Sequence, residues 1–408
     1  MRKLKLLLAV LAAGSPVAAC TAASNHEPAA DAPAADAPGF AAKVDFATGS
    51  NPEAVAIGDF NGDGKPDLVV ASTNAMAVSV LLNTTASGAL APSFAAKVDF
   101  PAGMGPVSIA IGDLNGDGKP DLAVANVGAN TVSVLINTTA PGAATPSFAA
   151  TVDFPTGASP EYVAFADIDG CGRPELAVAN FGSNTVSILL DTTPAGGTTP
   201  SFAAKVDFPT GEGPVAIAVG DLDGDGRPDL AVANLTSNTV SLLRDAGGSE
   251  LAAPTYAAKV DFPTGAGPNS VAIGDLDGDG RPDVAVANRD ETTVSLLFNT
   301  TATGATVPSC AAKVDVSTGA GPNFVAIGDL DGDGRADLAT ANFGSDTVSV
   351  VLDTAAAGAS TPSFAASVDY ATGAKPRTVA IGDFDGDGKA DLVIGNTSSS
   401  SVSVLLAR

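Results

Sequence analysis

Several residue types that enzymes commonly use are scarce or absent in this chain. Tryptophan is missing, and His26 is the only histidine. His26 lies in an Ala/Pro-rich stretch near the N-terminus, so histidine-based acid/base chemistry, Ser-His-Asp triads and histidine-rich zinc sites are excluded. Carboxylate chemistry is what remains for a catalytic site. The missing tryptophan also removes one common platform for a sugar ring.

Cysteine and basic residues are few as well. Of the three cysteines, Cys171 and Cys310 each replace a different residue type at a repeat position, so no disulfide framework is expected. Lys and Arg number 20 against 45 Asp and Glu, which gives a net charge of -25. Without a basic patch, binding to nucleic acid is disfavoured on electrostatic grounds.

No apolar run is long enough to span a membrane. The run from Leu6 to Ala13 follows basic residues and is typical of an export signal. The residues before Cys20 resemble a bacterial lipobox, in which Cys20 is lipidated and provides the only membrane attachment; cleavage near Ala19 without a lipid is the alternative. We expect a signal peptide over residues 1–19 and a flexible Ala/Pro linker over 20–39. The protein would be an outer-membrane or cell-surface lipoprotein, or otherwise periplasmic or secreted.

What the sequence has in abundance is repetition. An acidic loop recurs every 54 residues without insertion, and seven repeat units fill residues 40–408. The loops begin at Asp59, Asp113, Asp167, Asp221, Asp275, Asp329 and Asp383. Each unit has four short runs rich in Val, Ala, Leu, Phe and Thr, separated by Gly, Pro, Asn and Asp, which is the signature of strands and turns. The repeats predict an all-β, seven-bladed β-propeller with four antiparallel strands per blade.

The order of strands within a blade follows from residue size. The run VAIGD alternates large and small residues, such as Val55 and Ile57 with Ala56 and Gly58, which suits a strand with another blade on each face. This strand is therefore predicted to lie nearest the axis, and FAAKVDF outermost. The last unit has no FAAKVDF after it, so residues 40–46 are predicted to pair antiparallel with residues 401–406 and close the ring.

The acids are concentrated in the loops. Of the 45 Asp and Glu, 25 stand at positions one, three, five or nine of a loop such as DFNGDGKPD, and the remaining 20 balance the 20 Lys and Arg. Oxygen side chains at those positions, with a backbone carbonyl from position seven, form the hard, flexible cage that calcium prefers. Solvated β-turns are the alternative, but four carboxylates within nine residues repel one another without a cation.

Known calcium motifs differ from this loop. An EF-hand needs a bidentate Glu at position 12, where these loops have Val, Thr or Ile, and the nonapeptide period of RTX repeats is absent. Unit three is doubtful, because Cys171 replaces the position-five carboxylate and Glu175 replaces Asp at position nine. About six calcium sites are therefore expected, with Lys and Arg at position seven contributing only their carbonyls. The predicted residues are Asp59, Asn61, Asp63, Lys65, Asp67, Asp113, Asn115, Asp117, Lys119, Asp121, Asp221, Asp223, Asp225, Arg227, Asp229, Asp275, Asp277, Asp279, Arg281, Asp283, Asp329, Asp331, Asp333, Arg335, Asp337, Asp383, Asp385, Asp387, Lys389 and Asp391.

The motif VAIGDLDGDGRPDLAVAN, followed by FGSNTVSVLL, resembles the FG-GAP or VCBS repeat that also builds the integrin α-subunit propeller. The resemblance covers residues 40–408 and implies that the acidic loop joins the first and second strands of a blade and binds calcium. Members of this family include adhesion modules, lectins, lyases and other exported proteins, so the fold does not decide the function.

Three functions stay open. A monomeric, calcium-stabilised binding or adhesion scaffold for a glycan or an extracellular protein is favoured over a polysaccharide lyase or hydrolase, and a purely architectural protein is the third. The Asp of each VDF run recurs in every blade and is interpreted as structural, whereas Glu161, Glu212 and Glu291 are interpreted as scattered loop acids. A partner is expected to contact the face opposite the acidic loops, where the units differ most. The partner-face candidates are Tyr162, Phe181, Arg289, Phe324, Phe343 and Arg377.

Overall fold

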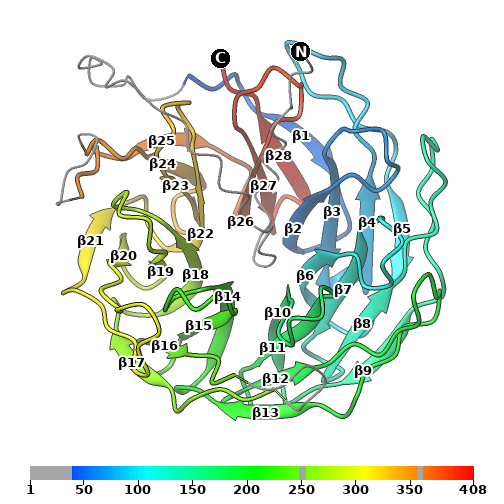
Figure 1. The fold of residues 1–408 in the computed structure, drawn as a ribbon. Helices are drawn as coiled ribbons and strands as arrows, with labels where there is room; N and C mark the ends of the chain where they lie inside the picture. Colours follow the sequence, from blue (N-terminus) through cyan, green and yellow to red (C-terminus); the bar gives the residue numbers. More distant parts are fainter. Residues whose placement is uncertain (1–38, 248–253, 356–361) are drawn as a thin grey trace, which may run out of the picture.

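The computed structural model describes residues 39–247, 254–355 and 362–408, and Figure 1 shows them as a ring of blades around an axis. The blades are seven four-stranded antiparallel sheets, which confirms the predicted seven-bladed propeller. One 3-10 turn, η1 (Thr73–Ala75), is the only helical element of the described residues, and none of their helices could cross a membrane. The predicted signal peptide, most of the linker and Cys20 lie outside the described residues.

The strands fall into four sets by their place in the blade. The innermost strands are β2 (Pro52–Gly58), β6 (Pro106–Gly112), β10 (Pro160–Ala166), β14 (Pro214–Gly220), β18 (Pro268–Gly274), β22 (Pro322–Gly328) and β26 (Pro376–Gly382). The second strands are β3 (Asp67–Ser72), β7 (Asp121–Asn126), β11 (Glu175–Asn180), β15 (Asp229–Asn234), β19 (Asp283–Asn288), β23 (Asp337–Asn342) and β27 (Asp391–Asn396). The third strands are β4 (Ala77–Leu81), β8 (Thr131–Leu135), β12 (Thr185–Leu189), β16 (Thr239–Leu243), β20 (Thr293–Leu297), β24 (Thr347–Val351) and β28 (Ser401–Leu405). The outermost strands are β5 (Val98–Pro101), β9 (Val152–Pro155), β13 (Val206–Pro209), β17 (Val260–Pro263), β21 (Val314–Ser317), β25 (Val368–Ala371) and β1 (Val44–Ala47).

The innermost strands meet one another as the alternation of large and small residues predicts. A Cβ added at Gly112 would lie 2.9 Å from the Phe165 ring of the next blade, and one at Gly220 would lie 2.9 Å from Ile273. Glycine therefore makes room for the large side chain of the neighbouring blade. Replacing either glycine would push two innermost strands apart.

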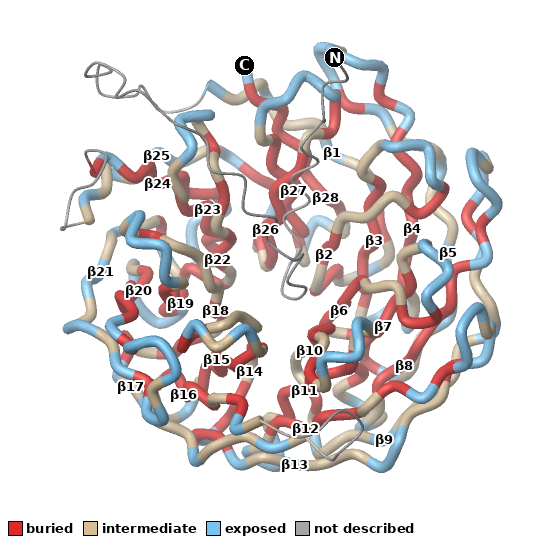
Figure 2. Tube along the Cα trace, in the orientation of Figure 1, coloured by how far each residue is buried: buried red, intermediate tan, exposed pale blue. Residues whose placement is uncertain are grey.

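The second and third strands form most of the core, as Figure 2 shows by their red colour. Every residue of β7 and β15 is buried, because each of these strands has a sheet on both faces. Side chains such as Val124 and Val232 are 0% exposed, and burying each contributes about 1.5–3 kcal/mol. The outermost strands contain only half-buried and exposed residues, which alternate in five of the seven blades, so these strands form the rim of the ring.

The Asp of each VDF run is structural, as expected. In blade two (β6–β9) the Ser133 hydroxyl donates to Asp153 Oδ1 at 2.5 Å, and Asn126 Nδ2 donates to Ser133 Oγ at 2.8 Å. This chain of bonds links the second, third and outermost strands. A serine-to-aspartate bond of the same kind occurs in all seven blades.

The N-terminal strand closes the ring, which confirms the prediction from the repeat boundaries. Strand β1 pairs antiparallel with β28 and completes blade seven (β26–β28), with Val44 opposite Val404 and Ala47 opposite Ser401. The regular strand is shorter than the predicted segment 40–46. Phe40 makes only an isolated bridge with Ala407, and the same irregular start occurs in the other six blades.

Candidate metal loops and an axial cavity

Each acidic loop joins the innermost strand of a blade to its second strand, as the resemblance implied. In blade one (β2–β5), the Asp59 carboxylate accepts N–H bonds from Asp63 at 3.0 Å and Gly64 at 2.8 Å, while Asn61 Oδ1 accepts from Asp63 at 3.2 Å. Gly64 has a φ of 84°, which a residue with a Cβ rarely adopts. The turn thus brings the oxygens of positions one, three and five together.

In blades four, five and six the carboxylates of positions one, three and five converge: one oxygen from each of Asp221, Asp223 and Asp225, for example, lies within 4.8 Å of the others. In blade seven the converging carboxylates are Asp383, Asp385 and the position-nine Asp391. Asn61 and Asn115 take one position in the first two loops and lower the charge there. The structure therefore gathers predicted ligands of positions one, three and five in three blades, and of positions one, three and nine in blade seven.

The position-nine carboxylates have a second role that sequence reasoning missed. Asp229 is 1% exposed, and its oxygens accept N–H bonds from Leu222 at 2.9 Å and Asp245 at 2.7 Å. Burial, with Asp223 and Asp225 nearby, raises the pKa of Asp229 to about 7. The other five aspartates at this position behave alike. A buried carboxylate beside three further acidic groups is a setting that a cation would stabilise.

The donor set fits calcium by its chemistry. The groups that converge are carboxylate and amide oxygens, which a hard cation prefers over nitrogen or sulfur ligands. The position-seven side chains are basic and cannot ligate a cation: Lys65 Nζ donates to Thr85 O at 2.8 Å, whereas Arg281 and Arg335 pair with the position-five carboxylates of their own loops. Only their carbonyls would then be available to an ion, as expected.

Unit three departs from this pattern. Cys171 brings its sulfur to the point where other loops place a carboxylate, beside Asp167 and Asp169. Burial raises the pKa of the Cys171 thiol, so it stays protonated and is a poor ligand for a hard cation. Glu175 takes over the buried position-nine role, because its Oε2 accepts the Ile168 N–H at 2.7 Å.

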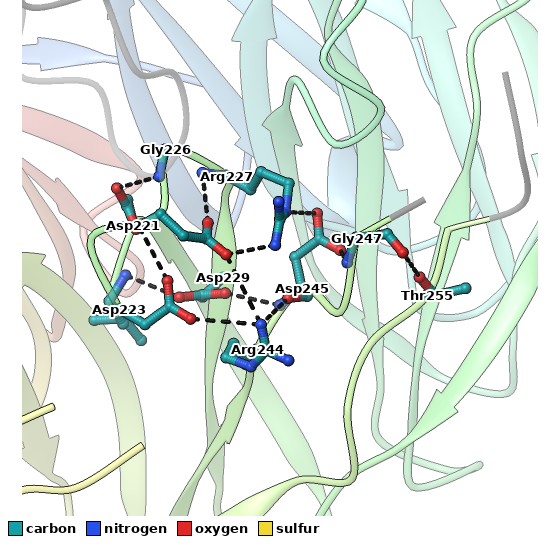
Figure 3. Close-up of polar contacts among 11 residues, drawn as sticks. Asp221, Asp223, Gly226, Arg227, Asp229, Arg244, Asp245, Gly247 and Thr255 are labelled. Carbon is teal, nitrogen blue, oxygen red and sulfur yellow. Dashed lines mark hydrogen bonds and ion pairs between the residues drawn. The ribbon is translucent and has the colours of Figure 1, made fainter. Parts of the chain in front are cut away.

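In unit four the guanidinium group of Arg244 lies beside the acidic loop, as Figure 3 shows. Arg244 Nη1 lies 3.5 Å from Asp223 Oδ2 and 3.8 Å from Asp225 Oδ2, and Arg227 also pairs with Asp225. The residue at the place of Arg244 in the other repeats is apolar, for example Leu82. The two guanidinium groups offset part of the acidic charge that an ion would otherwise meet.

The loops also join neighbouring blades, which the repeat pattern does not reveal. The Asn61 carbonyl at position three accepts the N–H of Gly142 from the next blade at 2.6 Å, and the Asp223 carbonyl accepts the N–H of Gly304 at 2.8 Å. Asn137 Nδ2 donates to the Phe60 carbonyl at 3.0 Å. Disorder in a loop would therefore disturb the junction between two blades.

At the opposite ends of the innermost strands lies a cavity of 240 Å³. Five of the six partner-face candidates line it: Tyr162, Phe181, Arg289, Phe324 and Arg377. The sixth, Phe343, is not among the lining residues; its ring lies 5.0 Å from Lys375 Nζ. The structure thus brings most of the symmetry-breaking residues of four repeat units to one place.

The second residues of the innermost strands form what we call the axial ring. Its members are Glu53, Val107, Glu161, Val215, Asn269, Asn323 and Arg377, and all seven line the cavity. The sequence-based interpretation of Glu161 as a loop acid is wrong, because Glu161 lies in β10. Glu53 was not singled out at all. Comparing the residue after the proline of each innermost strand would have found the ring.

The axial ring holds an ion pair and a partly unsatisfied amide. Arg377 Nε pairs with Glu53 Oε2, and Asn51 Nδ2 donates to Glu53 Oε1 at 2.7 Å. Asn323 Nδ2 donates to the Arg377 carbonyl at 2.9 Å, and Asn269 Nδ2 donates to the Asn323 carbonyl at 3.0 Å. Asn323 Oδ1 is buried and has no hydrogen-bond partner among the described residues.

Comparison with known proteins agrees with this architecture. Crystal structures of BBS1N in complex with ARL6DN, one soaked with lead and one with mercury, match with a TM-score of 0.56 and 14% identity over 90% of this chain and 97% of that chain. At that identity the likeness shows the fold alone. A search of curated proteins found no match.

Family models match the repeats themselves. The FG-GAP-like repeat matches residues 59–124, 113–178, 170–232, 221–286 and 275–340, and the FG-GAP repeat matches residues 376–405. Together these matches span most of the chain, including the acidic loops and the strands on either side of them. The protein therefore belongs to the FG-GAP repeat family.

Proposed function

We propose that this protein is an exported or surface-anchored, calcium-binding propeller that acts as a binding scaffold for a glycan or an extracellular protein. The observation that carries the proposal is the division between the two ends of the ring. One end repeats a converging set of hard oxygen ligands, and the other presents a cavity lined by residues that differ from blade to blade. A propeller of similar fold, BBS1N, was crystallised in complex with ARL6DN, a precedent for this shape as a protein-binding platform.

Calcium is proposed at the six loops with an intact set of oxygen side chains. In the metal-free protein the clustered carboxylates repel one another, and the ion would remove that repulsion at each blade junction. Calcium that binds only the folded state would add about 1 to 3 kcal/mol per occupied site at saturation. We expect the melting temperature to rise with calcium and to fall with EDTA. Magnesium is the control, because it demands a more rigid octahedral site. A melting temperature that EDTA leaves unchanged would contradict the calcium proposal.

A binding role is favoured over a glycosidase or lyase by the state of the axial carboxylates. Glu53 is occupied by Arg377 and Asn51, so the cavity offers only Glu161 as a free carboxylate, whereas glycoside hydrolysis usually needs two. An array of glycans and extracellular proteins, probed with calcium and with EDTA, tests the proposal. Calcium-dependent retention without turnover supports a scaffold; release of shortened glycan contradicts it.

Surface attachment is proposed through a lipid at Cys20. Mass spectrometry of the mature N-terminus, with Cys20→Ala as the control, distinguishes a lipidated Cys20 from simple cleavage near Ala19. Size-exclusion chromatography with light scattering tests the expected monomer. A lipid-free mature chain would leave the scaffold proposal in place and remove the anchor.

A further inference from the structure

We propose that the axial cavity binds a small primary alkylammonium compound, whose cationic group lies beside Glu161 and Asn323. The inference goes beyond the scaffold function, because a small amine can occupy the cavity whether or not the surrounding face binds a macromolecule. It rests on the asymmetry of the axial ring, on the polar groups left without partners, and on the aromatic walls.

The asymmetry comes first. The seven innermost strands repeat the same backbone, and at their other ends the same turns and nearly the same side chains recur. In the axial ring, however, two glutamates, two valines, two asparagines and an arginine stand at equivalent places. Packing around a symmetric axis does not require this mixture, because valine occupies the position in blades two and four. The polar members are therefore interpreted as groups that meet a ligand.

Two buried polar groups that line the cavity, Asn323 Oδ1 and the Thr378 hydroxyl, lack a hydrogen-bond partner among the described residues. Asn323 is 3% exposed, and its Oδ1 has no hydrogen-bond partner in the described part of the chain. Burying such an oxygen without a donor destabilises the protein, because the oxygen has lost its bonds to water. No hydrogen bond or ion pair involves the Glu161 carboxylate among the described residues, while the Glu53 carboxylate is already paired with Arg377. Neither guanidinium group that lines the cavity, that of Arg289 or that of Arg377, bonds to Asn323 Oδ1 or to the Glu161 carboxylate in the described part of the chain.

The charges point the same way. The residues that line the cavity carry two carboxylates and two guanidinium groups; Arg377 pairs with Glu53, whereas no ion pair involves Glu161 in the described part of the chain. Burial raises the pKa of Glu161 above its ordinary value of 4.5, with Glu53 adding to the rise and Arg377 opposing it. A bound cation would favour the ionised carboxylate. Arg289, which also lines the cavity, is exposed.

The walls and the size suit a short organic cation. Tyr162, Phe181 and Phe324 line the cavity, and aromatic faces attract ammonium groups. On the same face, Lys375 Nζ already lies 5.0 Å from the Phe343 ring centre. The volume of 240 Å³ falls below the ~300–1,000 Å³ typical of sites for drug-sized ligands, so a fragment-sized compound fits better.

Titration with n-butylammonium, followed by NMR and calorimetry on the calcium-loaded full chain, tests the inference. n-Butanol is the neutral probe of similar shape, and methyl α-glucoside represents a sugar. We expect n-butylammonium to bind in preference to both. Glu161→Gln should weaken it about tenfold or more, since a hydrogen bond to a charged group is lost. Glu212→Gln is the matched control: Glu212 is exposed in a turn of the same face and is not among the residues that line the cavity.

The outcomes separate this inference from the proposed function. Binding of n-butylammonium that Glu161→Gln removes and Glu212→Gln leaves unchanged supports the amine site. Equal binding of butanol, preference for the glucoside, or an unchanged affinity in Glu161→Gln overturns it. The calcium-dependent melting temperature and the array results do not depend on the amine, so the scaffold proposal stands or falls separately. Melting curves of both variants verify that they are folded.

Discussion

The two ends of the seven innermost strands obey different rules. At one end, every strand leads into an acidic loop of similar sequence, and in four of these loops a backbone carbonyl accepts an N–H bond from the next blade. At the other end, equivalent positions hold glutamate, valine, asparagine or arginine around a cavity. Both ends belong to the same seven strands, so the fold alone cannot explain why the residues recur at one end and differ at the other. Residues that recur in every blade are those that hold the blades together, whereas residues that differ between blades are those that are available to contact a ligand.

Opening the ring should have the largest effect, because both ends depend on closure. Deleting residues 40–48, so that the folded part starts at Gly49, removes β1 and its ladder to β28. It also removes the contact of Phe46 with Phe94 at 4.9 Å. We expect a loss of several kcal/mol in the free energy of unfolding, measured by urea denaturation. A truncated chain that unfolds at the same urea concentration would refute the role of β1 as the closing strand.

Two substitutions in unit two distinguish an aspartate that stabilises the fold, Asp121, from one that is proposed only to ligate calcium, Asp117. Asp121 accepts buried N–H bonds from Leu114 at 3.0 Å and Asn137 at 2.7 Å, so Asp121→Ala should cost about 2–5 kcal/mol even in EDTA. Asp117 is exposed and accepts one N–H bond from Lys119. Asp117→Ala should change stability in EDTA by less than about 0.5 kcal/mol, and both variants should lose one calcium. Equal destabilisation in EDTA would show that position nine has no special structural role.

The metal loops should make the stability of the metal-free protein depend on pH. Burial raises the pKa of the position-nine aspartates, such as Asp121 and Asp229, from 3.8 to about 7, so the folded state holds protons that the unfolded chain has released. Their contribution is full below about pH 3.8 and is lost as the pH rises toward about 7. Urea midpoints in EDTA should therefore fall over this range, and saturating calcium should reduce the fall. A midpoint in EDTA that rises steadily over the same range would contradict the prediction.

Restoring the missing ligand should make unit three like its neighbours. Cys171→Asp replaces a protonated thiol with a carboxylate beside Asp167 and Asp169. Calorimetry should count one more calcium ion in the variant than in the parent, and calcium should raise its melting temperature further. Cys171→Ser is the control, because its neutral hydroxyl adds no charge. If the parent already binds seven equivalent ions, the proposed weakness of unit three is wrong.

The smallest effect is expected at Arg244. Arg244→Leu places in unit four the residue type that its neighbours carry, and it removes a guanidinium that lies 3.5 Å from Asp223. Calcium affinity of this one loop should rise, since a positive charge that competes with the ion for the Asp223 carboxylate is removed. Leu82→Arg in blade one, the reverse change, should weaken its loop. A weaker unit four in Arg244→Leu would mean that the arginine supports the loop rather than competing for it.

The sequence alone determined what is local and repeated. The 54-residue period, the four apolar runs and the loop spacing were enough to predict the blade number, the strand order and the closing strand, since each depends on contacts that recur in every unit. The same spacing predicted which acids the loops gather. Only the tertiary structure decided which side chains meet around the axis, because ring closure brings Glu53 of blade one against Arg377 of blade seven. It also decided that Asp229 is buried and that Arg244 reaches Asp223, since burial and side-chain reach depend on neighbouring strands and not on spacing along the chain.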